Sequence, residues 1–491
     1  MGSQKYAGWR KPESTGLVPG LSTGMSIVVV VAIAIAIGCA YLLNSMKLAF
    51  IVLAATVVFV GPSMIRFRGT AAGDYFLAWV RTLPIRRKLA HRYRTGLFSH
   101  VPGGRSRLPG LASPIILDGL FDPEAGDDVG ALVNPVHRTI TVVMLVTATG
   151  RATQPEATTD AQVAGWGEFI RQAGEFGDVA GIAVVTETRP ETGARYEVEI
   201  EKRRHAAAPA LALELMDDRT VDLAPDRLRY SQRIAVTFRY SSGSFDLGCE
   251  MVSRRLPELS AAAAGAGLNA TFATVGEIIA FTHAAFNPAA GPIIDEAMAR
   301  TGDPGLTWED AGPTYHDDDH RYYLHDSGKS FTFRAYDFPV QPVEEDVLAK
   351  LLARNPRTPY KRVTMIYRPY RPQDAIETTD ADFRDAYAAA QRRKRGLVDA
   401  RQQMRLADIG ATRDDLAEGH GLTRVGMLVT ITVPVDGSGV DETDAIQAAG
   451  VAASIKFADC YSDQGAMFLT ALGIGVYPDM DETDVTDILR A

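Results

Sequence analysis

Two long apolar runs near the start of the chain set its most distinctive pattern. Residues 25–43 and residues 48–65 contain no charged side chain, and only residues 44–47 separate them. Each run has about 18 or 19 residues, roughly the number that a helix needs to cross a ~30 Å hydrocarbon layer. Neither run has the polar face of a buried helix in a soluble protein. The pattern predicts a transmembrane helical hairpin over residues 25–65.

The hairpin differs from a cleaved signal peptide because its first run starts late and a second run follows at once. Three basic residues precede it in the tail of residues 1–24, and ten Lys or Arg follow in residues 66–107 against one acid, Asp74. Lys and Arg beside membrane helices tend to remain in the cytoplasm. We therefore expect a two-pass protein of the cytoplasmic (inner) cell membrane, with both termini and the main body in the cytoplasm.

Residues 66–107 form a basic juxtamembrane collar. They carry a formal charge of +9 and residues 1–65 carry +3, which leaves −21 for the rest of a chain whose net charge is −9. A basic collar on an acidic body argues against general nucleic-acid binding and favours contact with anionic lipid, although the same charges also serve as a topology signal. The candidate lipid-facing residues are Arg86, Arg87, Lys88, Arg92 and Arg94.

A single amphipathic helix is expected within the collar, over residues 70–93 and interrupted at Pro84. Its apolar side chains include Phe76 and Trp79, and the arginine cluster follows them. Such a segment would lie along the membrane surface.

The remaining chain alternates between strand and helix patterns, which is typical of an α+β fold. For residues 108–245, the predicted strands are 137–147, 179–187, 196–200 and 232–240, with a helix at 159–176. Residues 246–330 are predicted to form a helical and loop region, with a loop over 301–330 that is rich in Gly, Pro, Asp and His.

The last part of the chain, residues 331–491, repeats the alternation at longer spacing. The predicted strands are 331–338, 362–370 and 425–435, and the predicted helices include 380–418, 441–454 and 463–472. We therefore predict a cytoplasmic body of two ferredoxin-like α+β halves, residues 108–245 and 331–491.

Two stretches contain residues that could carry chemistry. Gly328-Lys329-Ser330 matches the end of a phosphate-binding loop, but Tyr323 occupies the position of its first Gly and a strand pattern follows. The loop from His316 to His320 contains ligand types suited to Zn²⁺ or Mn²⁺, although a solvated acidic loop is the ordinary interpretation.

No GxSxG or HExxH motif is present, and the three cysteines form no CxxC pair, which fits a reducing cytoplasm. We predict no catalytic, cofactor-binding or metal-binding residue and no enzymatic activity. A membrane-bound metal- or nucleotide-dependent enzyme is kept as an alternative.

Two motifs in the final third resemble a known family. Residues 419–430, GHGLTRVGMLVT, and residues 461–473, YSDQGAMFLTALG, are similar to the end of the amino-terminal, non-motor domain of VirB/TraC-type conjugation ATPases. That domain ends in Leu-Pro-Leu-Gly, whereas residues 472–475 read Leu-Gly-Ile-Gly and lack the proline. No motor domain follows before Ala491.

The hairpin resembles the PrgI-like small membrane subunits that accompany those ATPases. Together with the start Tyr6, Gly8, Trp9 and Arg10, the chain resembles an actinobacterial family that joins such a hairpin to a motorless VirB-ATPase-like domain. The resemblance implies a non-catalytic scaffold of a type IV secretion or conjugation apparatus, which docks a secretion ATPase and other secretion subunits at the membrane. It leaves room for a homo-oligomer and implies no direct nucleic-acid contact. An EccE-like subunit of a type VII secretion system is the alternative.

Overall fold

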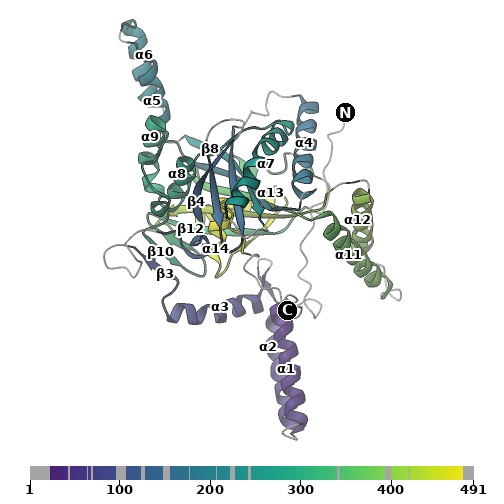
Figure 1. Ribbon diagram of the computed structural model, residues 1–491. Coiled ribbons are helices and arrows are strands. Elements are labelled where there is room, and N and C mark those ends of the chain that lie inside the picture. Colours follow the sequence, from purple (N-terminus) through teal and green to yellow (C-terminus); the bar gives the residue numbers. More distant parts are fainter. Residues whose placement is uncertain are drawn as a thin grey trace.

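The computed structural model describes residues 23–41, 45–63, 65–67, 70–95, 107–122, 128–147, 155–175, 177–205, 207–221, 227–240, 245–339, 343–344, 346–392, 400–417, 419 and 421–478. The chain described is an α+β protein built on one large antiparallel sheet (Figure 1). Nearly all of the predicted tail of residues 1–24, with Tyr6 and Trp9, lies outside the described residues.

The helices are α1 (Thr23–Tyr41), α2 (Met46–Ser63), α3 (Ala72–Arg87), α4 (Glu156–Glu175), α5 (Ala194–Arg203), α6 (Ala210–Val221), α7 (Phe245–Gly265), α8 (Val275–Phe286), α9 (Gly291–Thr301), α10 (Ala349–Leu352), α11 (Pro372–Arg392), α12 (Ala400–Ala417), α13 (Val440–Ala452) and α14 (Gln464–Leu472). Short 3-10 helices lie at Gly110–Ala112, Pro288–Ala290 and Trp308–Ala311.

The strands are β1 (Arg66–Phe67), β2 (Thr70–Ala71), β3 (Arg92–Arg94), β4 (Ile116–Phe121), β5 (Asp128–Asn134), β6 (Thr139–Thr147), β7 (Val179–Pro190), β8 (Leu228–Arg239), β9 (Asn269–Phe272), β10 (Tyr315–Asp318), β11 (Tyr323–His325), β12 (Gly328–Asp337), β13 (Tyr360–Pro369), β14 (Thr423–Pro434) and β15 (Lys456–Asp459). β1 and β2 pair with each other; the others form the large sheet.

The large sheet has the order β3-β10-β11-β12-β14-β13-β7-β8-β6-β5-β4, with β15 paired to β12 and β9 paired to β6. Within it, two sets of four strands follow the same plan. β6, β7, β8 and β9 are neighbours in the order β9-β6-β8-β7, and β12, β13, β14 and β15 in the order β15-β12-β14-β13. Both sets connect through helices at equivalent steps: α4 and α7 in the first, α10 and α13 in the second.

The two sets meet along one pair of equivalent strands, β7 and β13, which we call the seam. Seven residue pairs align there in antiparallel register, from Lys361 opposite Thr188 to Tyr367 opposite Ile182. Main-chain hydrogen bonds therefore continue from one set into the other, and the body is a single sheet rather than two separate ones.

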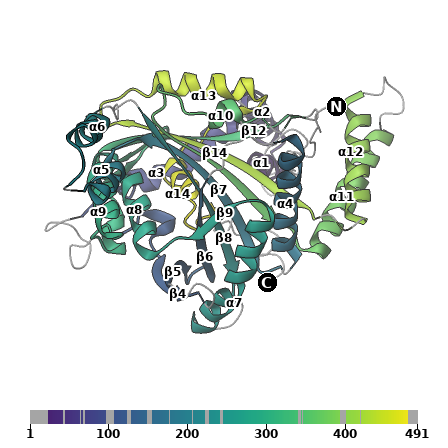
Figure 2. The same ribbon diagram turned by 90° about the horizontal axis from the view of Figure 1, so that it is seen from above.

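Alternating side chains divide the sheet into two faces, as the pleat of a strand requires. In β6, Val142 and Met144 pack into a core with α4 and α7, whereas Val143 lies in the core on the opposite face. The face that α4 and α7 cover in the first set is covered in the second by α10 and α13, around Val363 and Ile431. The opposite face holds α8 and α14, and Figure 2 shows α14 near the middle of the sheet.

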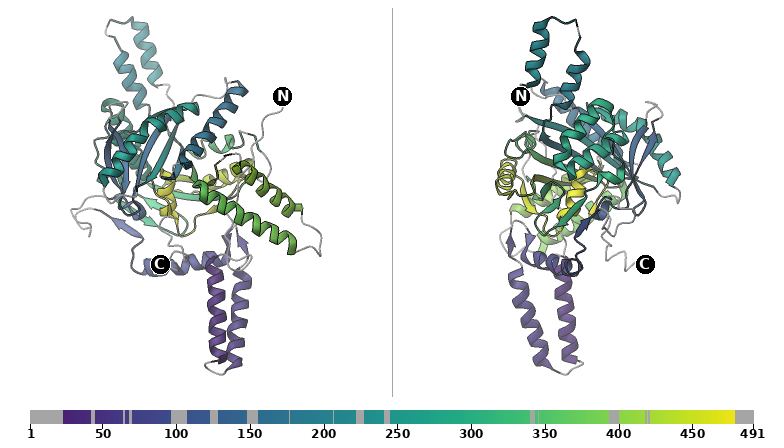
Figure 3. Two further views of the ribbon diagram at one scale, coloured as in Figure 1. Left: turned by 45° about the vertical axis from the view of Figure 1, so that its right-hand side comes forward. Right: turned by 90° about the vertical axis from the view of Figure 1, so that its left-hand side faces the viewer.

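Pairs of helices extend away from the body at equivalent points of the two sets. α5 and α6 connect β7 to β8, and α11 and α12 connect β13 to β14. Figure 3 shows both pairs as arms that stand off the sheet, and it shows α1 and α2 lying side by side on the opposite side of the body from α5 and α6.

By length and composition, one helix in the described part of the chain, α2, could cross a membrane. The apolar stretch of the helix before it, Ser26–Tyr41, is shorter. Only 6% of the α2 span is buried within the protein.

The structure corrects several predictions at the level of single elements. Residues 196–200 were expected to form a strand from the alternation of Tyr196, Val198 and Ile200, but they lie in helix α5. Glu199 pairs with Arg203 four residues on, which favours a helix, and Val198 is buried. The sequence pattern of this short segment fits a strand and a helix equally, and tertiary packing selects the helix.

Two further differences lie in the collar and in the predicted loop. α3 continues through Pro84 to Arg87, so the helix is not interrupted there, and it ends before the predicted Tyr93. Residues 301–330, predicted as loop, contain β10 and β11. Their polar side chains did not prevent strand formation because each strand has a paired neighbour on both sides, β10 between β3 and β11, and β11 between β10 and β12.

Candidate functional site

The collar joins the α1–α3 region to the edge of the large sheet. Residues 92–94 form strand β3, which pairs with β10 so that Arg92 lies opposite Asp317 and Arg94 opposite Tyr315. A cavity of about 550 Å³ lies beside this junction, between the end of α3, β3 and β10. We refer to the collar together with residues 315–320 as the collar junction.

Two of the five candidate lipid-facing residues contact carboxylates of the body. The Arg86 guanidinium lies 3.4 Å from an Asp319 oxygen, and Arg92 Nε donates to Asp317 Oδ2 at 2.9 Å. These partly exposed ion pairs are each worth at most about 1 kcal/mol. They place the acidic loop against the collar, so the basic and acidic segments that the sequence showed separately form one junction.

The other three candidates lie at the outside of the junction. Arg87 and Lys88 are exposed at the end of α3. Arg94 is exposed as well, with its guanidinium 5.1 Å from the centre of the Tyr315 ring. Contact between the collar and lipid stays a prediction, and Arg87 and Lys88 are the two residues that this structure leaves exposed at the helix end.

The His316 to His320 loop is held by contacts with protein groups. His316 stacks on Tyr93 with the ring centres 5.2 Å apart, and His320 Nδ1 lies 2.6 Å from Ser462 Oγ. Within the described residues, no group of three or more His, Cys, Asp or Glu side chains could hold a metal ion. Burial lowers the pKa of His316 to about 4, so this ring is neutral near pH 7.

Asp318 has the most perturbed carboxyl of the junction. Its Oδ1 accepts a hydrogen bond from the Gly465 backbone N–H at 3.0 Å, in the first turn of α14. Burial raises the pKa of the Asp318 carboxyl to about 7 and outweighs that hydrogen bond. Asp318 thus joins β10 to the start of α14, and its charge changes in the physiological pH range.

The phosphate-loop candidate Lys329 lies in a strand. It is the second residue of β12, and its Nζ donates to the Gly437 carbonyl at 2.8 Å. Ser330 is buried, and its Oγ lies 2.7 Å from His325 Nε2. A phosphate loop needs backbone N–H groups at the start of a helix, and these residues instead supply a strand and its interior hydrogen bonds.

The motif that carried the family resemblance, residues 461–473, forms α14 and its flanks. Phe468 is fully buried in the core that contains Phe286 and Tyr323. The buried Gln464 accepts from the Thr332 backbone N–H at 2.8 Å and donates to the Thr332 carbonyl at 3.2 Å. In this structure the motif's residues hold α14 against the sheet.

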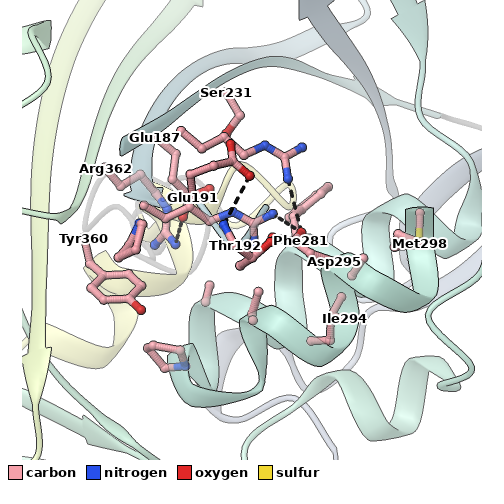
Figure 4. A pocket seen from close by; sticks show the side chains of 18 of the residues that line it. Glu187, Glu191, Thr192, Ser231, Phe281, Ile294, Asp295, Met298, Tyr360 and Arg362 are labelled. Carbon is pink, nitrogen blue, oxygen red and sulfur yellow. Dashed lines mark hydrogen bonds and ion pairs between the residues drawn. The ribbon is translucent and has the colours of Figure 1, made fainter. Parts of the chain in front are cut away.

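Sequence reasoning missed a charged cavity of about 310 Å³ on the α8–α14 face of the sheet, between the strands and helices α8 and α9 (Figure 4). Its charged lining includes Glu187 on β7, Arg233 on β8, Arg362 on β13 and Asp295 on α9. The predicted strands over 179–187 and 232–240 already contained Glu187 and Arg233. A charged residue inside an apolar strand was the one available signal, but only the folded sheet brings these charges together.

The first ion-pair group of this cavity joins Glu187, whose side chain is 16% exposed, to two almost fully buried arginines. Glu187 receives hydrogen bonds from Arg233 Nη1 at 2.7 Å and from Arg362 Nη2 at 2.8 Å. Burial alone would raise the pKa of the Glu187 carboxyl, but the two guanidinium groups outweigh it and hold the pKa well below its usual range. Glu187 is therefore ionised, and it connects three adjacent strands.

The second group joins the strand ends to α9. Asp295, of which 3% is exposed, pairs with Arg189 of β7 and with Arg229 of β8, the latter at 3.1 Å. Thr192 Oγ1 also donates to Asp295 Oδ2 at 3.1 Å. Burial, reinforced by the neighbouring Arg189 charge, lowers the pKa of Arg229. Positive charges thus lie close together at both ends of the cavity.

The pKa of Asp318 predicts how stability depends on pH. The folded protein keeps this proton to about pH 7, whereas an unfolded chain loses it near pH 4. Asp318 therefore destabilises the fold increasingly as the pH rises from about 4 to about 7. Asp318→Asn mimics the protonated carboxyl and keeps an acceptor for Gly465. We compare the free energy of unfolding of the variant with that of wild type at each pH. We expect this difference, variant minus wild type, to increase by about 2–4 kcal/mol from pH 4 to pH 8.

The measurement is urea unfolding of both full-length proteins in detergent micelles at several pH values. Other titrating groups, including His316 and His325, are present in both proteins and cancel in the difference. A difference between the variant and wild type that stays constant over this pH range would contradict the assignment.

Comparison with known proteins gives no relative for this chain: no protein-family model matches it, and no curated protein does.

Proposed function

We propose that this protein is a non-catalytic, membrane-anchored scaffold of a type IV secretion or conjugation-like apparatus, which docks a secretion ATPase at the cytoplasmic membrane. The observation that carries the proposal is the pair of apolar helices α1 and α2, which extends from a large body and is tied to it by the collar (Figure 1). A motor that moves substrates across a membrane has to be held there. An anchor joined to a continuous sheet suits that task.

The exposed side chains of α1 and α2 support a membrane location. Both helices present large apolar residues to the outside, among them Val31 and Ile37 of α1 and Phe50 and Val58 of α2. An exposed apolar surface of this extent is costly in water and suited to lipid. In the proposal both helices cross the membrane, and the positive collar keeps the body in the cytoplasm.

The repeated strand plan supports the proposal of two ferredoxin-like halves, although the first set needs α7 and β9 and so extends to Phe272, past the predicted bounds of 108–245. Each set has the element order β-α-β-β-α-β and places its strands as fourth, first, third and second. The insertions α5–α6 and α11–α12 fall at the same step, between the second and third strands. Pairing of the two second strands at the seam relates the halves by an approximate two-fold rotation.

The arms offer surfaces for the proposed docking. Leu211 and Leu215 of α6 and Ile376 and Tyr387 of α11 are more than half exposed. Apolar side chains on an extended helix pair can pack into a groove of a partner protein. Because α5 and α6 extend away from α1 and α2 (Figure 3), a partner docked there would lie on the side of the body away from the membrane.

The proposed topology predicts which positions a membrane-impermeant maleimide reaches in intact cells. We expect Ser45→Cys, between α1 and α2, to be labelled from outside, in a chain whose native Cys39, Cys249 and Cys460 are replaced by alanine. Val451→Cys, on the body and 75% exposed, should be labelled only after the cells are permeabilised. Labelling of Val451→Cys in intact cells would reverse the topology, and protection of Ser45→Cys in intact cells would contradict two membrane crossings.

The collar predicts a measurable affinity for anionic lipid. A chain that starts at residue 66 should co-sediment with vesicles containing phosphatidylglycerol, and the double variant Arg87→Gln, Lys88→Gln should bind about 30-fold more weakly. The control is Arg86→Gln, because Arg86 contacts Asp319. Arg86→Gln should weaken binding less than the single variants Arg87→Gln and Lys88→Gln do. High salt should weaken the binding of all these proteins to the vesicles. Equal binding of the double variant and wild type would exclude a lipid contact at the end of α3.

The proposed function is tested by purifying the tagged full-length protein from its own membranes in mild detergent and identifying the co-purifying proteins by mass spectrometry. We expect a VirB/TraC-type motor ATPase. Recovery of EccB-, EccC- and EccD-like subunits would assign the protein to type VII secretion instead. Absence of any secretion subunit, with the tagged protein intact and folded, would contradict the scaffold proposal.

A further inference from the structure

The arginine-lined cavity of Figure 4 has a charge that its own ion pairs do not neutralise. Arg189, Arg229, Arg233 and Arg362 surround only two carboxylates, those of Asp295 and Glu187. These six side chains carry a formal charge of +2. Glu191 and Glu277 outnumber Arg195 among the other charged lining residues, and the Lys361 ammonium donates to the Leu351 and Ala353 carbonyls on the opposite face of the sheet. The charges that face the cavity therefore sum to +1. A concave site with an excess of positive charge attracts an anion.

Arg362, at the wall of this site, has hydrogen-bond donors without a partner among the described residues. Its side chain is 6% exposed and lines the cavity, and Nη2 donates to Glu187. Neither Nε nor Nη1 of Arg362 has a hydrogen-bond partner among the described residues, and both atoms are buried. Buried donors of a charged group are costly to leave unpaired. The Arg362 guanidinium, which lies over the Phe468 ring with its centre 5.4 Å from the ring centre, is therefore incompletely hydrogen-bonded at the wall of the cavity.

The amino-terminal end of helix α9 adds positive electrostatic potential to the cavity. Its first residues, Gly291 and Pro292, line the cavity, and no side chain caps its amino-terminal end. The amino-terminal end of a helix carries a partial positive charge. This contribution has the same sign as the excess of arginines.

The rest of the wall is apolar and aromatic. Phe281 and Ala284 of α8 and Ile294 and Met298 of α9 line it, and Tyr360 of β13 faces them from the opposite side in Figure 4. A volume of about 310 Å³ is at the lower end of the range for small-molecule sites. The lining thus combines a charged end for an anion with an apolar space for an organic body.

We propose that this cavity binds a phosphate-bearing small molecule, a phosphomonoester on an apolar or aromatic body. A phosphomonoester carries a charge of about −1.5 to −2 at neutral pH, which is opposite in sign to the excess charge of the cavity, and guanidinium groups bind phosphate oxygens in bidentate geometry. The ligand contacts both strand sets and the start of α5, where Thr192 of the preceding turn and Arg195 of the first helical turn line the cavity. Its binding stabilises the seam and the base of the α5–α6 arm. The site is independent of the proposed secretion role.

The test measures binding to the purified full-length protein in detergent micelles by isothermal titration calorimetry and by thermal unfolding. The probes are adenosine monophosphate, inorganic phosphate and adenosine. We expect adenosine monophosphate to bind and to raise the unfolding temperature, inorganic phosphate to bind more weakly, and adenosine not to bind. Equal affinity for inorganic phosphate and the nucleotide would keep the phosphate site and remove the organic body from the proposal.

Two variants and a control separate a ligand site from a structural ion-pair network. Arg229→Gln leaves Asp295 paired with Arg189 and should weaken binding of both phosphate probes by about tenfold or more. Ala284→Leu fills the apolar part without removing charge and should weaken the nucleotide more than inorganic phosphate. Arg254→Gln, at an exposed pair on α7, should change neither affinity.

Several results would overturn the proposal. They are no binding of either phosphate probe to the folded wild type at millimolar concentration, unchanged phosphate affinity in Arg229→Gln, and adenosine affinity equal to that of the monophosphate. The ligand measurements need no secretion partner, so failure of this proposal and failure of the scaffold proposal are distinguishable.

Discussion

The body depends on a buried carboxylate at the seam. Glu187 lies on β7, and its guanidinium partners come from β8 and β13, so one ion-pair group connects the strands on both sides of the seam. An isolated carboxylate in this environment would be unstable. Removal of one partner from a buried ion pair typically costs about 3–5 kcal/mol. Loss of the charge from either half would therefore destabilise the seam.

The same group also positions α14. The Arg233 guanidinium donates to the Leu472 carbonyl through Nε at 3.2 Å and Nη2 at 3.1 Å, at the carboxyl end of the helix. Thr364 Oγ1 donates to the Ala471 carbonyl at 2.7 Å from the other side of the seam. These bonds satisfy carbonyls that have no partner within a helix. As a result, α14 lies across the seam beside the ion pairs.

A mechanical connection runs from the apolar helices into this sheet. α3 leads into β3, β3 pairs with β10, and β10 continues through β11 and β12 to the second strand set. The collar's ion pairs lie along this route, and Asp318 links it to α14. Under the proposed scaffold function, force on a docked motor would pass through backbone hydrogen bonds rather than through a flexible linker. Hydrogen-bonded strands transmit load well because the bonds act together.

The sequence by itself determined the α+β class, the two apolar runs and most strands and helices of the body. These features depend on hydrophobic periodicity, which is local and can be read over ten or twenty residues. It also showed the acidic and basic segments of the junction, but not that Arg86 and Arg92 would meet Asp319 and Asp317 across more than two hundred positions. Only the tertiary structure joined the two strand sets into one sheet, made α5 a helix, and gathered the charged residues of β7, β8, β13 and α9 around one cavity. The physical reason is that strand pairing and buried ion pairs join residues far apart in the chain, whereas a local pattern carries no information about which distant partner completes it.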